Sequence, residues 1–137
     1  MPDKPQSWES IGVGGALVHS YGQSQKDFVP SLAVLLEQAM PEVTVIVRKP
    51  IRLFSSDKRI ESITVALGDN SYSLLDRNAS LPLEAKRVKV VRGIALRTDI
   101  ISVQEWLSEV GAEVSRRADQ SHEALAALQN FMEIKSI

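Results

Sequence analysis

The sequence predicts an α+β fold, in which an antiparallel meander of four to five short strands is covered on one face by an N-terminal-half helix and a long C-terminal helix. Strand-like segments follow one another between residues 43 and 96, without the intervening helices that a parallel sheet requires. Helical apolar spacing occurs before and after this region. The charge is divided along the same boundaries.

The middle of the chain is basic and both ends are acidic. Residues 48–97 contain eleven Lys/Arg and five Asp/Glu, residues 1–47 contain two and five, and residues 98–137 contain three and seven. The formal charge of −1 therefore conceals a basic strand region between acidic helical regions. This pattern indicates either a face for an acidic partner or internal charge complementarity.

Size and composition predict one globular domain. The 137 residues, 44% of them hydrophobic and 24% charged, suit a single α+β domain over residues 8–137, preceded by a disordered tail over residues 1–7. The absence of cysteine excludes disulfides, thiol catalysis and thiolate zinc sites, and agrees with a cytoplasmic location. No apolar run approaches the length of about 20 residues that crosses a membrane, so no membrane span is expected.

The N-terminal half is predicted to contain one helix. Residues 11–21 are apolar but include three glycines, which weaken a regular helix or strand and permit close backbone approach. We therefore expect an irregular strand or loop there. From Asp27, an N-cap residue type, apolar residues recur at helical spacing as far as Pro41, which predicts a helix over about residues 28–40.

The strands are predicted from alternation and turn chemistry. The β-branched run at residues 43–48 predicts the first strand. Residues 60–67 alternate, and a Gly-Asp-Asn turn leads to a partner strand over residues 72–76, so this pair is the clearest hairpin. Residues 81–83 and 88–96 are expected to add a short strand and a longer one.

A long helix is predicted to begin near Ser102, because Glu105 follows at capping-box spacing. An unbroken helix as far as Met132 would be about 46 Å long, whereas a domain of this size measures roughly 35–40 Å across. The helix should therefore bend or overhang, with Gly111 as a weak point. A polar stretch over residues 115–122 separates its two apolar blocks.

The terminal helix is the best predicted interaction surface, because a second amphipathic block beyond a polar stretch can pack on another subunit or in a partner's groove. The alternative is that this block folds back onto the chain's own sheet. The predicted partner-binding residues are Trp106, Leu125, Leu128, Phe131 and Met132.

The basic strand region suggests an anion-binding site, since its cations are interleaved with apolar residues. The alternative is a hairpin tip whose apolar side chains cap the core while its charges stay solvated. The predicted anion-binding residues are Arg48, Lys49, Arg52, Lys58, Arg59 and Arg92, with Arg87 and Lys89 nearby. The scarcity of aromatic residues and the slightly negative net charge argue against nucleic acid as a partner.

Arg92 raises a question of its own, because regular alternation over residues 88–96 would point it into an apolar face. A buried charge without a partner costs several kcal/mol, so an inward Arg92 would require a carboxylate or an anionic ligand. The alternative is a bulge at Val91-Arg92-Gly93 that turns the side chain to solvent. We favour the outward position.

No catalytic, cofactor-binding or metal-binding motif is recognisable. The segment over residues 11–17 starts like a dinucleotide-binding glycine loop but lacks the third glycine, and His19 and His122 have no partners at ligand spacing. We therefore expect a small cytoplasmic protein-binding or assembly module, either homo-oligomeric or bound to another protein. The alternatives are anion or nucleic-acid binding through residues 48–97 and, third, a cofactor-free enzyme that uses carboxylates and Arg92.

Overall fold

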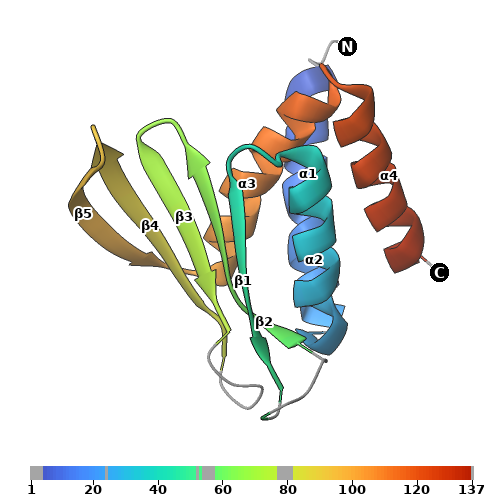
Figure 1. Cartoon of the computed structure of the whole chain (residues 1–137). Helices are drawn as coiled ribbons and strands as arrows, with labels where there is room; N and C mark the ends of the chain where they lie inside the picture. Colours follow the sequence, from blue (N-terminus) through green and yellow to red (C-terminus); the bar gives the residue numbers. More distant parts are fainter. Residues whose placement is uncertain (1–4, 24, 52, 54–57, 77–81, 137) are drawn as a thin grey trace. The chain divides into compact units, whose positions relative to one another are not determined.

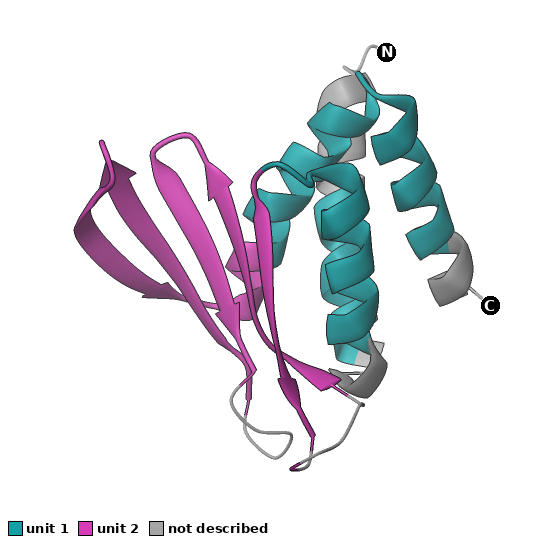
Figure 2. Ribbon diagram, in the orientation of Figure 1, with its two compact units in different colours: residues 1–42, 107–137 teal, residues 43–106 magenta. Residues whose placement is uncertain are grey.

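The computed structural model describes residues 5–23, 25–51, 53, 58–76 and 82–136. Its helices and five-stranded antiparallel sheet confirm the predicted α+β class and the meander. The chain forms two compact units, which Figure 2 distinguishes by colour. The helical unit comprises residues 1–42 and 107–137, and the sheet unit comprises residues 43–106. The single domain expected over residues 8–137 stays a prediction. Of the tail expected over residues 1–7, residues 1–4 lie outside the described residues, and residues 5–7 belong to the first helix.

The first helix corrects the prediction for residues 11–21. These residues are helical, within α1 (Pro5–Gln23), and are neither an irregular strand nor a loop. The helix tolerates its glycines because one of them lies at a contact between helices. A Cβ on Gly14 would lie 3.1 Å from the Cα of Ser108, and a Cβ on Gly111 would lie 3.0 Å from the Cα of Gly14. The close backbone approach that the glycines permit is thus present, but between helices.

Gly111 is not a point of weakness in the structure. Helix α3 (Val103–Ala118) runs through it without interruption, because the missing side chain at this position makes room for α1. The fully buried Leu17 lies at the same contact, with its Cδ1 3.1 Å from where a Cβ on Gly111 would stand. Glycine therefore costs helix propensity here but allows two helices to approach.

Helix α2 (Gln25–Ala39) begins three residues before the predicted start. Asp27 consequently lies inside the first turn, beyond the N-cap position, and Pro30 lies in the helix itself. Phe28 is fully buried, and its ring meets that of Tyr21 of α1 edge to face, with 5.5 Å between ring centroids. This contact connects the two helices across the short link between them.

The C-terminal helical region divides into two helices. The predicted start is confirmed, since the Glu105 N–H donates to the Ser102 hydroxyl at 3.0 Å. Helix α3 ends at Ala118, and α4 (His122–Ser136) begins after a turn, where the Ala124 N–H donates to the Ser121 hydroxyl at 3.3 Å. The break falls within the polar stretch, where a continuous helix would gain little burial.

The sheet unit is an antiparallel meander whose strands lie side by side in chain order (Figure 1). The five strands are β1 (Thr44–Pro50), β2 (Lys58–Leu67), β3 (Asn70–Leu75), β4 (Glu84–Val91) and β5 (Ile94–Ile101). The first predicted strand and the predicted central hairpin are confirmed as β1, β2 and β3. Strands β1 and β5 form the two edges.

The strand predicted over residues 88–96 is two strands, since β4 and β5 meet at a tight turn. Arg92 and Gly93 form this turn with φ of 54° and 81°, and Val91 pairs with Ile94 on either side. Positive φ at both central residues is the geometry that joins twisted antiparallel strands with two residues. Of the short strand predicted over residues 81–83, Leu81 lies outside the described residues, and residues 82–83 precede β4 without forming a strand.

The pleat gives the sheet a buried face and an open face. Ile63, Val65, Tyr72, Leu74 and Ala85 are buried and share one face in the observed register. The opposite face carries hydroxyl side chains at its centre, including Thr64 and Ser73, whose hydroxyl oxygens lie 3.3 Å apart. The period-2 alternation in the sequence thus predicts which residues form the core of this unit.

Candidate functional site

Helices α2 and α4 pack against each other within the helical unit. From α4, the buried residues Ala124, Ala127 and Phe131 form a stripe with helical spacing. From α2, Leu32 and Leu35 are fully or almost fully buried. The apolar block after the polar stretch therefore packs on a helix of its own unit.

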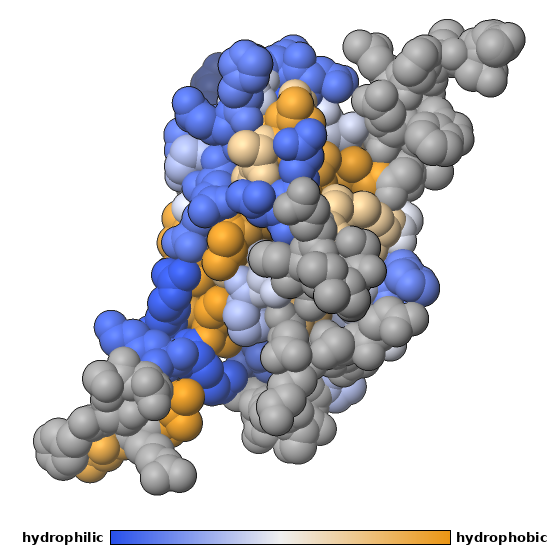
Figure 3. Space-filling view, turned by 90° about the vertical axis from the view of Figure 1, so that its right-hand side faces the viewer, coloured by the Kyte–Doolittle hydropathy of each residue, from blue (hydrophilic) through white to orange (hydrophobic). Residues whose placement is uncertain are grey.

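A hollow of about 220 Å³ lies between these two helices. Its lining is mainly apolar, with a few polar groups that can form hydrogen bonds. The lining residues are Pro30, Ser31, Val34, Leu35, Gln38, Ala127, Asn130 and Phe131. Val34 is 52% exposed although the buried residues of α2 surround it in sequence. Figure 3 shows apolar surface among hydrophilic side chains in the view from the right-hand side of Figure 1.

The predicted partner-binding residues differ in burial and in position. Trp106 is fully buried, and its indole N–H has no hydrogen-bond partner within the described part of the chain. Phe131 is buried except where it lines the hollow, whereas Leu128 is half-buried. Leu125 and Met132 remain exposed on α4, each at 39%. The structure therefore brings only Phe131 of this set to the hollow.

Sequence reasoning missed the contribution of α2 to this hollow, in particular Pro30 and Val34. The available signal was Val34 itself, since it is apolar but lies off the stripe formed by Phe28, Leu32 and Leu35. The stripe alone could not show that a second helix would pack beside Val34 and leave a space there. That depends on where α4 lies.

A cluster of charges connects the end of α2 to α3. Arg117 donates to Glu42 and, at 3.0 Å through Nε, to Glu113. Arg116 donates to Glu113 at 3.0 Å and to the Gln120 side chain at 3.3 Å. The hydrogen bond from Arg116, reinforced by Arg117, holds the pKa of Glu113 below its usual range against the opposing effect of burial. The Arg117 hydrogen bond likewise lowers the pKa of Glu42.

A second hollow, of about 330 Å³, opens beside this cluster. Its lining includes Glu42, Arg116, Arg117 and Glu123. Because both guanidinium groups already bind carboxylates, the hollow offers an anion no strong positive field. The cluster is best explained as a link between the segment after α2 and the end of α3.

The structure brings four of the predicted anion-binding residues together and places Arg92 apart from them. Lys49 pairs with Arg59 and Pro50 with Lys58 across β1 and β2, next to Arg48, so these cations share the end of one hairpin. The Lys49 ammonium lies 2.8 Å from Glu61, and Arg59 donates to the Asp76 carbonyl at 2.8 Å. Part of the positive charge is therefore balanced. The predicted Arg52 lies outside the described residues.

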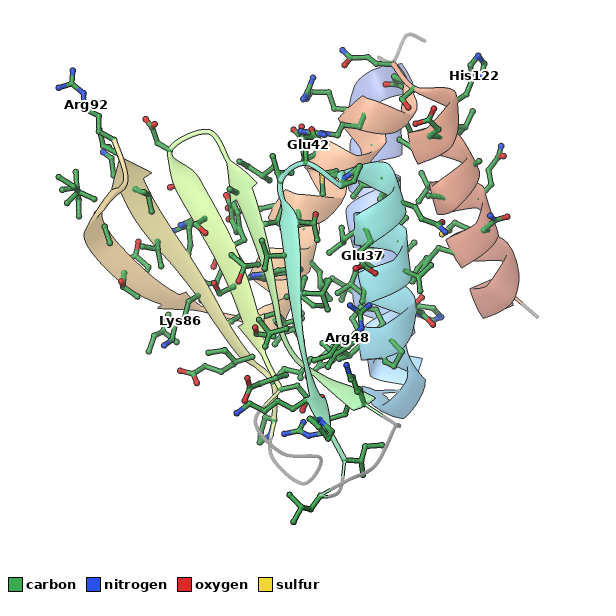
Figure 4. The ribbon with its side chains drawn as sticks, in the orientation of Figure 1. Glu37, Glu42, Arg48, Lys86, Arg92 and His122 are labelled. Carbon is green, nitrogen blue, oxygen red and sulfur yellow. The ribbon has the colours of Figure 1, made fainter. Side chains whose placement is uncertain are left out.

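Arg92 lies far from that hairpin end, at the β4–β5 turn, and its side chain is exposed (Figure 4). The favoured outward position is thus correct, although a turn and not a bulge produces it. Arg87, in the middle of β4, contacts two carboxylates, at 3.7 Å to Asp99 and 3.2 Å to Glu105. Arg92 and the cations at the end of the β1–β2 hairpin accordingly cannot contact one small anion together.

No grouping of three or more His, Asp or Glu suited to a metal ion occurs among the residues that the structure describes. His19 of α1 and His122, the first residue of α4, are both exposed. The glycines that resembled the start of a dinucleotide loop lie in α1, within a helix instead of between a strand and a helix.

Comparisons of the chain with protein families, with curated proteins and with solved structures found no match. In the described part of the chain, every helix is too short or too polar to cross a bilayer. The function of the site therefore has to be inferred from its geometry.

Proposed function

We propose that this protein is a small cytoplasmic protein-binding or assembly module without catalytic activity, and that the α2–α4 hollow receives an apolar side chain of a partner protein. The observation that carries the proposal is the exposed Val34 at an apolar hollow between two packed helices. Side chains that fill well-packed, desolvated pockets, aromatic ones in particular, are among the residues that contribute most to protein interfaces. The absence of cysteine agrees with the reducing cytoplasm.

The size of the hollow favours a side chain over a cofactor. Pockets for small molecules commonly measure about 300–1,000 Å³, which exceeds the 220 Å³ observed here. The polar side chains of Ser31, Gln38 and Asn130 stand among the lining residues, where they can bind the backbone or polar groups of the partner. An apolar anchor with polar contacts around it is the usual composition of a protein interface.

The proposal is tested by replacing Val34 with Glu and comparing the proteins that each purified variant retains from a lysate of the source cells. A charge in the hollow would be buried by the partner, which costs several kcal/mol, so retention of a true partner should fall at least about tenfold. Val45→Glu is the matched control, because Val45 is also exposed but lies on β1. Circular dichroism confirms that both variants remain folded.

The decisive pattern is a protein that the wild type and Val45→Glu both retain and that Val34→Glu loses. If every retained protein binds Val34→Glu as well as it binds the wild type, the hollow is not the binding site. If the same protein is lost from both variants, the added charge acts nonspecifically and the proposal for the hollow fails as well.

A second candidate function is anion or nucleic-acid binding at the β1–β2 hairpin end. The observation in its favour is the cross-strand proximity of Lys49 and Arg59, with Arg48 and Lys58 beside them. The ion pairs of Lys49 and Arg59 reduce the field that a phosphate would meet. Such binding would be weak and would fade between about 50 and 200 mM salt, whereas contacts in an apolar hollow would persist.

A further inference from the structure

Strand β5 is an open edge of the sheet with apolar side chains. Leu96 is 60% exposed and Ile100 is 74% exposed, and Ile94 is exposed to a similar extent. The strand spans eight residues without a proline. An exposed edge of this kind can accept another strand, because one row of its backbone groups has no neighbouring strand among the described residues.

The other edge, β1, carries features that discourage strand addition. Its register shifts between Val47 and Arg48, and the strand then continues through Lys49 to Pro50, which has no N–H to donate. Strand β5 also contains an irregularity, since Leu96 is the extra residue where the register to β4 shifts. From Arg97 onward, however, β5 is regular.

The hydrogen-bonding pattern of the sheet shows which backbone groups of β5 face the open edge. The Val90 N–H donates at 2.7 Å to the carbonyl of Asp69, the residue before β3, so the backbone groups of Val90 point toward β3. Backbone groups alternate along a strand, so those of Lys89 and Arg87 point toward β5, opposite Arg97 and Asp99. The backbone groups of Thr98 and Ile100 consequently point outward.

We propose that β5 pairs antiparallel with β5 of a second copy of this chain, about a twofold axis at Thr98. In this register Thr98 lies opposite Thr98 of the second copy, and Arg97 lies opposite its Asp99. The proposal deepens the proposed assembly function by naming a second copy as a partner, and it does not involve the α2–α4 hollow. An isologous pair of this kind uses the same residues on both chains.

The charges select this register. Antiparallel pairing about a twofold axis allows the strand to slip only in steps that keep side chains on the same face. A slip by one such step in either direction places Arg97 opposite Arg97 of the second copy, or Asp99 opposite its Asp99. Like charges directly opposite are unfavourable, whereas the Thr98-centred register forms two pairs of opposite charge. Within one chain, Arg97 already contacts Asp99 at 2.9 Å, so all four charges would alternate.

The expected dimer is weak, because the irregularity at Leu96 limits the regular ladder to residues 97–99, which is a smaller interface than stable dimers have. We expect a dissociation constant of about 10–100 μM, which sedimentation equilibrium between about 5 and 500 μM covers. Arg97→Asp would place two carboxylates opposite each other, at positions 97 and 99, and should leave the protein monomeric throughout this range. Arg92→Asp is the matched control, since it makes the same charge change at an exposed site outside the ladder, and should dimerise like the wild type.

A cysteine at the axis gives an independent test, because the chain contains no natural cysteine. Thr98 would face its own copy with Cα atoms about 5.5 Å apart, within the range that a disulfide spans. Mild oxidation should therefore convert Thr98→Cys into a covalent dimer. Val45→Cys, on the exposed side of β1, is the control and should remain monomeric. Adding Arg97→Asp to Thr98→Cys should abolish the dimer.

Mixing provides the test of register. Chains with Thr98→Cys and Arg97→Asp, combined with chains carrying Thr98→Cys and Asp99→Arg, should form mixed disulfide dimers, because opposite charges again lie across from each other. Arg87 retains Glu105 as a partner in the second variant. Failure of the mixture to recover the dimer would contradict the register, and with it the proposed pairing.

A wild type that is monomeric at about 500 μM, or a Thr98→Cys chain that cross-links no better than Val45→Cys, overturns the pairing. A dimer that Arg97→Asp leaves intact and Val34→Glu abolishes would place self-association at the α2–α4 hollow. That result would contradict the β5 pairing but not the proposed function of the hollow. If the dimer instead behaves as expected while Val34→Glu loses no retained protein, the pairing stands and the proposal for the hollow fails.

Discussion

The helical unit and the sheet unit both depend on glycine, but for different physical reasons. In the helical unit Gly111 provides space, since any Cβ there would lie 3.0 Å from the Gly14 Cα. In the sheet unit Gly93 provides a backbone conformation, since its φ is 81° and a Cβ at this position would have no described atom within 4 Å. Glycine is needed in the helical unit because two elements are in contact, and in the sheet unit because of the local backbone conformation.

This difference means that the same substitution tests different properties in the two units. Alanine at a contact glycine measures how far two helices can separate. Alanine at a turn glycine measures the cost of a left-handed residue with a Cβ. Gly15 offers a third case, because it is in the same helix as Gly14 but has nothing within 4 Å of a Cβ among the described residues.

The largest effect is expected for Gly111→Ala. The new Cβ would meet backbone and the buried Leu17, which have little freedom to move, so the free energy of unfolding should fall by about 1–3 kcal/mol. Gly15→Ala is the matched control and should stabilise the protein by about 0.5–1 kcal/mol, because alanine favours the helix. Urea denaturation measures both. Equal stability of the two variants would show that α1 and α3 are not in close contact.

The next largest change in stability is expected at the β4–β5 turn, where substitutions of its two residues should act differently. Gly93→Ala should cost about 1–2 kcal/mol, because alanine is strained at positive φ. Arg92→Asn should change stability in the opposite direction, by up to about 1 kcal/mol, since asparagine tolerates the left-handed region better than arginine. Arg92→Ala should have a small effect, within roughly 0.5 kcal/mol, because the side chain is exposed. A loss of several kcal/mol in Arg92→Ala would instead indicate a buried partner.

The smallest expected effect lies in the charge cluster of the helical unit. The pKa of Glu113 is lowered in the folded state by Arg116 and Arg117, so its contribution to stability is complete above the pKa of the unfolded chain, about 4.3. That contribution is lost as the pH falls through the lower folded pKa. Glu113→Gln should therefore reduce stability at about pH 7 by no more than about 1 kcal/mol, as for other partly exposed ion pairs.

The same variant should lose less stability than the wild type between about pH 5 and about pH 3, because it lacks the proton that Glu113 takes up. Urea midpoints at the two pH values give this comparison. Arg117→Gln, combined with Glu113→Gln, tests the pair directly, since effects of the two changes should not add. Strictly additive effects and an unchanged dependence of stability on acid pH would show that Glu113 and Arg117 do not form a stabilising ion pair.

The sheet unit is more predictable from the sequence than the helical unit. Residues 60–67 and 72–76 alternate, and this local property already distinguishes the buried face from the open one. Turn chemistry is informative where a Gly-Asp-Asn turn joins β2 to β3, but the pattern around Arg92-Gly93 predicts one continuous strand. Arginine is an unusual residue at positive φ, so of the two turn residues only Gly93 indicates an interruption of the strand.

For the candidate site, the sequence identifies the amphipathic block of α4 but not the surface against which it packs. The apolar spacing singles out Phe131 but not Val34, because the role of Val34 depends on a helix about a hundred residues later. The sequence also shows Arg48, Lys49, Lys58 and Arg59 as a basic set, but the ion pairs of this set with Glu61 and Asp76 require the register of three strands.

The α+β class, the meander, the N-cap of α3 and the buried face of the sheet follow from the sequence alone, because each depends on residues that are neighbours in the chain. That residues 11–21 form a helix follows only from the folded chain, since the contact with α3 is what makes Gly14 favourable there. The same is true of the hollow beside Val34 and of the open edge at β5. Close contacts and open edges are created by elements that meet in space, and short-range patterns carry no information about which elements meet.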